Sequence, residues 1–219
     1  AALAAAIGIQ TLRQSQPQLT SPYGSFAIGV KVGLALDGVQ WGIVRSADDQ
    51  RATYYFRGPA IDACARAEHK ATAGDIILDS TAWDIVGDAV TVEEMGDMAR
   101  LVAVTGDLPA AVAPLARQPD LALMSRYFPT SVLTQGMTGE FRWVTNVFIA
   151  LPTVRTDIQL HAFMQTVFEL QIRYGGFVNR LDFGDKGANL LLFWGAPIAL
   201  ENDIARALGF LLDLQARSS

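Results

Sequence analysis

Two stretches of the chain carry hydrophobic and polar positions at spacings regular enough to predict helices and strands. Alternating Val, Ile and Leu over residues 26–36 predict a strand, and Asp37-Gly38 after it is a strong hairpin signal. The first stretch predicts, in chain order, a helix over 1–14, a loop over 16–24, a strand over 26–36 paired with a strand over 39–45, a polar loop over 46–51, a short aromatic segment over 53–56, a helix over 59–70, and strands over 74–78, 90–95 and 99–105.

The second stretch begins with a predicted strand over 142–151. A helix follows, capped by Thr156-Asp157 and stopped by Gly175-Gly176, and then come strands over 177–182 and 190–194, joined by a turn. The side chains expected to face the core are Ile158, Phe163, Val167, Leu170 and Tyr174 on this helix, and Ile204, Leu208, Leu211 and Leu212 on a last helix that begins at Asn202 or Asp203.

Between the two stretches, residues 108–139 contain four prolines and little periodicity, with one short helix predicted over 121–127. A connector of this length is unusual inside one compact domain. We therefore expect two units, over 1–107 and 140–219, joined by residues 108–139.

Composition narrows the classes of protein that remain. Hydrophobic residues make up 51% and charged residues 18% of 219 residues, and the net charge is −5. These values exclude a disordered acidic tail and a strongly basic nucleic-acid-binding protein. The single cysteine, Cys64, excludes a disulfide framework and fits the cytoplasm. No apolar run approaches the ~18–20 residues of a membrane span, so we do not expect a membrane as a partner. The charge balance likewise gives no reason to expect nucleic acid as a partner.

The chain does not begin with Met, and its first and last residues already have helical patterns. We therefore expect a piece of a longer protein.

Few individual residues indicate chemistry. The chain has no P-loop and no nucleophile elbow, and its two histidines, His69 and His161, lie far from each other and from Cys64. We interpret the histidines as structural or surface residues and Cys64 as a small buried hydrophobe. The pair Asp48-Asp49 is interpreted as part of a solvated loop.

The segments over 54–62 (YYFRGPAID) and 64–69 (CARAEH) resemble the strand-to-helix junction of class III nucleotidyl cyclases, in which Gly-x-x-Val-Asn-x-x-x-Arg opens a helix. Further segments that resemble this family are 29–33 and 38–42 before the junction, 139–148 as an opening strand, 175–180 and 193–197 as a central hairpin, and 201–208 as the helix after it. The order of these segments is the back half of one cyclase domain followed by the front half of the next. The whole is similar to the middle of a tandem pair of the soluble, bicarbonate-sensing adenylyl cyclase type.

The resemblance implies an α+β fold, with a ferredoxin-like βαββαβ cyclase-type sheet assembled from the two half-domains. In that sheet the opening strand over 142–151 would lie between the strand over 26–36 and the hairpin. We expect this assembly by circular permutation within one chain, or by exchange between two chains in a homodimer.

The family holds two metal ions with two Asp residues. The first belongs to a Phe-x-Asp-Ile pattern, and Ala150 occupies its position here. The second, counted back from Gly195, corresponds to Ala188, and Asp185 is an alternative that we interpret as a turn residue. Because alanine offers no oxygen to a cation, this front half resembles the degenerate partner of a pair.

The remaining family positions are candidates for a regulatory site. Asp62 occupies the position of an Asn, Arg66 that of an Arg that stabilises phosphate charge, Tyr55 that of a purine-reading Asp, and Arg180 that of an adenine-reading Lys. Arg66 has a plain alternative, a helix-surface ion pair with Asp62. In related cyclases the degenerate pocket is where bicarbonate acts, near the position of Arg66.

The resemblance therefore implies a fragment of an adenylyl cyclase whose parent converts ATP to cyclic AMP and pyrophosphate with Mg or Mn. We expect this chain alone to be inactive, to need no cofactor, and to associate with the other cyclase halves or a second copy. The alternatives are a non-catalytic regulatory or dimerisation module that binds a small anion or nucleotide, and an interaction domain without a ligand.

Overall fold

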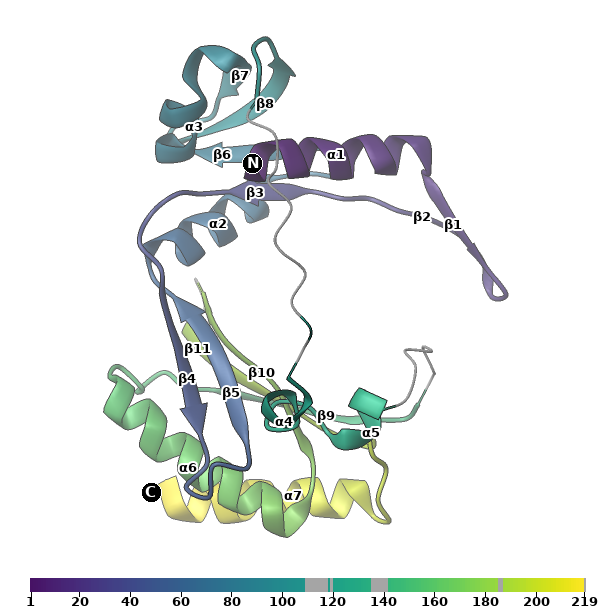
Figure 1. Ribbon diagram of the computed structural model, residues 1–219, viewed down its shortest axis with the longest axis vertical. Coiled ribbons are helices and arrows are strands. Elements are labelled where there is room, and N and C mark those ends of the chain that lie inside the picture. The colour runs from purple at the N-terminus through teal and green to yellow at the C-terminus, as the bar shows by residue number, and fades with distance from the viewer. Residues whose placement is uncertain (109–117, 119, 135–141, 185–186, 219) are drawn as a thin grey trace. The chain divides into compact units, whose positions relative to one another are not determined.

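The computed structural model describes residues 1–108, 118, 120–134, 142–184 and 187–218. Its helices and strands form an α+β structure, as predicted. The chain divides into two compact units (Figure 1), which are residues 1–39 with 57–116 (unit 1) and residues 40–56 with 117–219 (unit 2). None of the described helices is both long and apolar enough to cross a membrane.

Unit 1 is built on a four-stranded sheet in the order β3-β6-β8-β7, in which β3 is parallel to β6 and the other neighbours are antiparallel. Its elements are α1 (Ala2–Ser15), β1 (Gln18–Ser21), β2 (Gly24–Ala27), β3 (Val32–Leu34), α2 (Pro59–Lys70), β6 (Ile76–Asp79), α3 (Ser80–Val86), the 3-10 helix η1 (Gly87–Ala89), β7 (Val90–Glu94) and β8 (Met98–Val104).

Small residues allow close packing in unit 1. Helix α2 buries Ala60, Ala63 and Ala67. It lies so close to β3 that a Cβ placed on Gly33 would be 2.5 Å from the amide nitrogen of Glu68. Only glycine fits there, so the contact between α2 and β3 is fixed by backbone proximity.

Unit 2 is built on a three-stranded sheet in the order β10-β11-β9, with β11 antiparallel to both neighbours. Its elements are β4 (Gln40–Arg45), β5 (Ala52–Arg57), α4 (Leu121–Met124), α5 (Thr130–Thr134), β9 (Thr145–Ala150), α6 (Asp157–Tyr174), β10 (Phe177–Gly184), β11 (Gly187–Trp194) and α7 (Asp203–Ser218). The expected connector helix is thus present as α4.

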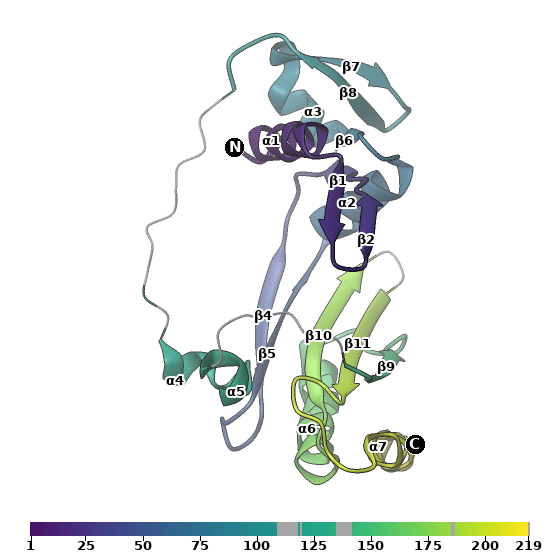
Figure 2. The ribbon, with the colours of Figure 1, turned by 90° about the vertical axis from the view of Figure 1, so that its right-hand side faces the viewer.

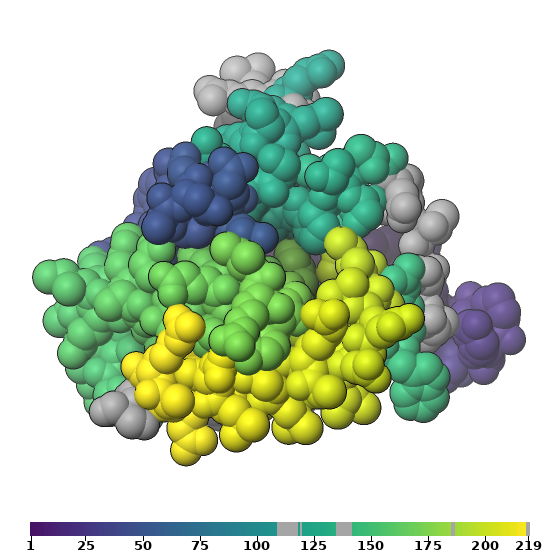
Figure 3. Space-filling model, turned by 90° about the horizontal axis from the view of Figure 1, so that it is seen from below, coloured from purple at the N-terminus to yellow at the C-terminus, as the bar shows by residue number. Residues whose placement is uncertain are grey.

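The core of unit 2 lies between one face of this sheet and the helices α6 and α7. Helix α6 is capped by Thr156 and ends at Tyr174 before Gly175, as predicted, and Thr156 forms a capping box with Gln159. Figure 3 shows α6 in green and α7 in yellow side by side on one surface. The fully buried Trp194 packs its ring against that of Phe210 with centroids 5.2 Å apart, which joins β11 to α7.

The predicted hairpin around Asp37-Gly38 is wrong. The strand β4 pairs with β5, and the polar loop between them, which we expected to be a plain connection, is the hairpin loop. This loop closes through the Ser46 amide, which donates to the Arg51 carbonyl at 2.8 Å. The hairpin, seen along its length in Figure 2, places Val44 and Tyr55 in the core of unit 2. Burial of these two side chains outweighed the local turn signal.

The long strand predicted over 26–36 is also wrong. Strands β2 and β3 occupy its two ends, and β2 forms a short hairpin with β1 in the segment predicted as a loop. The α3 helix, which no pattern predicted, is capped by the Asp79 carboxylate, which accepts the Ala82 N–H at 2.8 Å.

The structure does not contain the single permuted sheet that we expected within one chain. In the described residues β9 pairs with β11, and β3 pairs with β6 in another sheet. The exchanged homodimer involves a second copy and stays a prediction, as do the half-domain boundaries over 1–107, 108–139 and 140–219.

The inward faces expected for the two helices of unit 2 are partly wrong. On α6 the residue Ile158 is 83% exposed, whereas Val167 and Leu170 are buried as predicted. On α7 the buried side chains are Ala207, Phe210 and Leu214, and the predicted core residues Ile204, Leu208 and Leu212 are 67%, 56% and 68% exposed. The apolar stripe of Ile204, Leu208 and Leu212 therefore faces outward, whereas Leu211, which was also predicted to face the core, packs against it partly buried.

Candidate functional site

Tyr55, the candidate for the purine-reading position, is buried on β5 in unit 2. Its hydroxyl donates to the Asp157 carboxylate at 2.9 Å, and its ring contacts Phe183 with centroids 5.2 Å apart. The amide of Gln40 donates to the other oxygen of Asp157 at 3.2 Å. This network ties both strands of the hairpin to the N-terminus of α6, so Tyr55 acts here as a structural residue.

Arg180, the candidate for the adenine-reading position, lies exposed on β10 in unit 2. Its guanidinium forms an ion pair with Asp182 two residues along the same strand. A surface pair of this kind contributes little to stability. It leaves the guanidinium accessible to a ligand from the solvent side.

Asp62 and Arg66 lie on α2 in unit 1, Asp62 half-buried and Arg66 exposed. The ion pair that we considered between them does not occur, and the described residues offer the Arg66 side chain no other ion pair or hydrogen bond. The four regulatory candidates therefore belong to two units, with Asp62 and Arg66 in one and Tyr55 and Arg180 in the other.

Ala150 and Ala188, the positions of the metal-binding Asp residues, are brought together at one end of β9 and β11. Ala150 is opposite Asn189 in the ladder, one step from Ala188. Because paired residues point to the same face of a sheet, the two alanines point to opposite faces, with Ala188 in the core and Ala150 exposed. Carboxylates at these two positions would not converge on one metal site. Asp185, the alternative, lies outside the described residues.

The other polar residues that we considered have ordinary surroundings. His69 and His161 are exposed on helices. Cys64 is half-buried, its thiol donates to the Gly33 carbonyl at 3.3 Å, and burial raises the pKa of that thiol. A group of three His, Cys, Asp or Glu able to hold a metal does not occur in the part of the chain that the structure describes.

Asp48 and Asp49 are parts of the β4–β5 loop. Asp48 accepts a hydrogen bond from the Ser46 hydroxyl and another from the Gln50 N–H at 3.1 Å, which lower the pKa of its carboxyl. Asp49 pairs with Arg126 at 2.8 Å. The two carboxylates thus have separate structural partners, which fits our interpretation of a loop.

A cavity that sequence reasoning missed lies beside the β4–β5 loop in unit 2. It has a volume of about 310 Å³, and its lining residues include two arginines, Arg51 and Arg126, and aromatic residues such as Phe168 and Phe177. The residues that form it come from β5, from the segment around α4 and α5, from α6 and from β10. No single run of sequence carries this combination, so only the fold reveals it.

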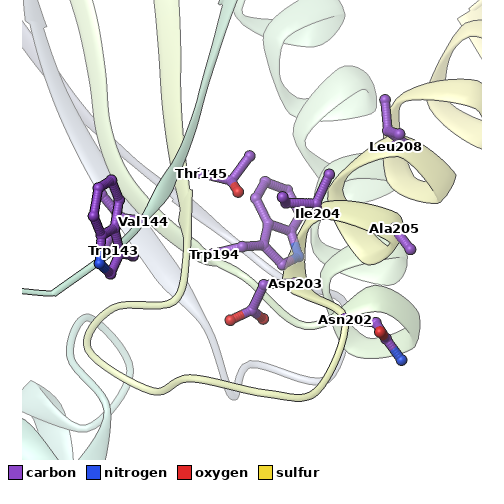
Figure 4. A pocket seen from close by; sticks show the side chains of 9 residues that line it. All are labelled: Trp143, Val144, Thr145, Trp194, Asn202, Asp203, Ile204, Ala205 and Leu208. Atoms are coloured by element: carbon purple, nitrogen blue, oxygen red, sulfur yellow. The ribbon is translucent and has the colours of Figure 1, made fainter.

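A second cavity, of about 590 Å³, lies between the start of β9 and the start of α7 (Figure 4). It is mainly apolar, and the carboxylate of Asp203, the first residue of α7, accepts the Leu200 N–H at 3.2 Å from the segment before the helix. The side chains that line it are Trp143, Val144, Thr145, Trp194, Asn202, Asp203, Ile204, Ala205 and Leu208.

Comparison with known proteins adds no family. A scan against models of protein families finds no match to this chain, and a search of curated proteins finds none either.

Proposed function

We propose that this chain is part of a class III nucleotidyl cyclase whose parent forms cyclic AMP and pyrophosphate from ATP, and that the chain alone is inactive. The element order of unit 2, β9–α6–β10–β11–α7, supports the proposal, because a ferredoxin-like βαββαβ sheet begins with the same series of elements. The strand order β10-β11-β9 agrees as well, since such a sheet carries its third strand between the first and the second.

The observation that carries the proposed inactivity is Ala150 at the end of β9. Cyclisation by the two-metal route requires carboxylates that hold the ions aligning the 3′-hydroxyl with the α-phosphate. The exposed methyl group of Ala150 has no oxygen with which to bind a cation. The parent's catalytic carboxylates and its Asn and Arg would then come from other parts of the longer protein.

The first test is a cyclase assay on the purified chain with ATP and either Mg²⁺ or Mn²⁺. We expect no cyclic AMP above the protein-free control. Metal-dependent formation of cyclic AMP by this chain would show that the positions assigned to Ala150 and Ala188 are wrong.

The second test is the sequence of the parent gene. An Asp pair encoded before Ala1, together with an Asn-x-x-x-Arg pattern encoded after Ser219, would support the cyclase relationship. Absence of both patterns from the parent would contradict the cyclase relationship, because neither of its composite sites could then bind metal or stabilise phosphate.

A regulatory module that binds a small anion or nucleotide is the second candidate, and the 310 Å³ cavity favours it. Arg51 and Arg126 suit an anionic group, which would share Arg126 with the Asp49 carboxylate, and the aromatic lining suits a planar group. Calorimetry with ATP and with bicarbonate tests this function. Arg51→Gln should abolish the heat of binding, whereas Arg180→Gln, the matched change at the family-derived position, should leave it unchanged. Loss of binding in Arg180→Gln but not in Arg51→Gln would place the ligand at Arg180. If neither compound gives a heat of binding, the remaining alternative is an interaction domain without a ligand.

A further inference from the structure

The strand β9 is an edge strand whose outer side is open in the described residues. It pairs only with β11 there. The Leu151 N–H donates to the Ala188 carbonyl at 2.8 Å. Because an antiparallel ladder alternates, the backbone groups of Asn146, Phe148 and Ala150 point away from β11. Three successive outward pairs of N–H and C=O groups are thus available along one edge.

This edge lacks the usual protection against pairing. Natural edge strands carry charges, prolines or bulges that prevent edge-to-edge association. The sequence of β9 is Thr-Asn-Val-Phe-Ile-Ala, with no charged residue and no proline, and its register with β11 is regular. Phe148 at its middle is 68% exposed.

Apolar side chains continue from this edge onto the neighbouring helix. Ile204 and Leu208 of α7 line the 590 Å³ cavity together with Val144 and Thr145 at the start of β9, as Figure 4 shows. Leu212 extends the same stripe by one further helical turn. An open edge bordered by exposed apolar surface is typical of an interface that is buried in an assembly.

We propose that β9 pairs antiparallel with β9 of a second copy of this chain, across a two-fold axis. The edge is self-complementary, because the outward residues Asn146, Phe148 and Ala150 are evenly spaced about Phe148. Phe148 then lies opposite its own counterpart, with Asn146 opposite Ala150. The two sheets of unit 2 become one six-stranded sheet, and the apolar stripes of the two α7 helices border the joint. This inference does not rest on the proposed cyclase relationship, and it concerns the chain by itself, because a complete ferredoxin-like sheet would place its fourth strand at this same edge of β9.

The oligomeric state is the first test. Sedimentation velocity over a wide range of protein concentrations should show a monomer–dimer equilibrium. A monomer at all concentrations would overturn the pairing. So would open-ended growth, because the antiparallel contact closes on itself and leaves β9 with no free edge.

Phe148→Lys tests the surface. It places two like charges opposite each other on the axis, and we expect the dissociation constant of the dimer to rise at least tenfold. The matched control is Ile172→Lys on α6, where the replaced side chain is 58% exposed and distant along the chain from β9. A dimer that Phe148→Lys leaves intact would refute the β9 interface, and circular dichroism checks that both variants are folded.

A crosslink tests the register. In a Cys64→Ala background, Phe148→Cys places one cysteine of each copy in a hydrogen-bonded pair on the two-fold axis. The Cα atoms of such a pair are about 5.5 Å apart, which is within the range of about 4.4–6.8 Å for disulfides. We expect a disulfide-linked dimer under mild oxidation and none with Ile172→Cys. A dimer that forms no such disulfide would have to use another contact, such as exchange of residues 26–36, and would overturn the symmetric pairing.

Discussion

The two units of this chain pack their helices against their sheets with side chains of different size. Unit 1 uses small residues, since α2 meets the sheet through Ala60, Ala63 and Ala67 and approaches β3 at Gly33. Unit 2 uses large ones, with Trp194 and Phe210 fully buried at its centre. Close backbone contact makes unit 1 sensitive to added atoms, whereas the large core of unit 2 makes it sensitive to their removal.

The largest expected effect is on the core of unit 2. Phe210→Ala removes a fully buried ring from its contact with Trp194 and should destabilise unit 2 by about 3–5 kcal/mol. Urea unfolding followed by fluorescence measures this in single-tryptophan variants that also lack Trp41 and Trp143, in which Trp194 reports on unit 2 and Trp83 on unit 1. An equal shift of both signals would show that the two units unfold as one.

The next prediction concerns unit 1, in which a substitution adds an atom to a close contact. Gly33→Ala adds a Cβ that would be 2.5 Å from the Glu68 nitrogen and 2.6 Å from the Cys64 carbonyl oxygen, and it should cost about 1–3 kcal/mol. Gly8→Ala is the control, because open space surrounds Gly8 on α1 and alanine should stabilise that helix by about 0.5–1 kcal/mol. Thermal unfolding followed at Trp83 should move in opposite directions for the two variants.

An effect of similar size concerns the attachment of the β4–β5 hairpin. Tyr55→Phe removes a hydrogen bond to the Asp157 carboxylate and should destabilise unit 2 by about 1.5–3 kcal/mol. Tyr54→Phe, on the exposed face of the same strand, should change the free energy of unfolding by less than about 0.5 kcal/mol. Equal effects of the two changes would contradict the structural role of Tyr55.

The smallest effects are two pKa shifts, one in each unit. Hydrogen bonds from Ser46 lower the pKa of Asp48, and those from Thr72 lower the pKa of Asp75. A carboxyl with a depressed folded-state pKa contributes stability above its unfolded pKa, and this contribution is lost as the pH falls through the folded value. Ser46→Ala should raise the pKa of Asp48 toward 3.8 and leave Asp75 unchanged in an NMR titration, and Thr72→Val should do the reverse.

Local patterns predicted most elements of unit 2 correctly. The capping box at Thr156, the stop at Gly175 and the two strands after it carry their signals in adjacent residues. Burial was harder to predict, because helical spacing locates an apolar stripe without showing what covers it. The stripe of α7 that begins at Ile204 is apolar, yet Ala207, Phe210 and Leu214 on another side of the helix face the core.

Long-range pairing was the main failure. Asp37-Gly38 is a strong local turn signal, but β4 pairs with β5 because Val44 and Tyr55 have partners in unit 2 that lie far along the chain. The geometry at the candidate positions also depends on pairing. The family positions of Ala150 and Ala188 are adjacent along the ladder but face opposite sides of the sheet, which only the register reveals. The cavity lined by Arg51 and Arg126 has no continuous sequence signature.

The hairpin of β4 and β5 also affects how this protein must be made. A ribosome that adds about 5–20 residues per second completes the strand Ala52–Arg57 roughly 10–30 s before α7, which completes its hydrophobic partners. During that interval the core that Tyr55 enters is incomplete, and a strand rich in aromatic side chains is open to pairing with other nascent chains. Growth at low temperature, or with excess chaperone, should therefore increase the soluble yield of the whole chain.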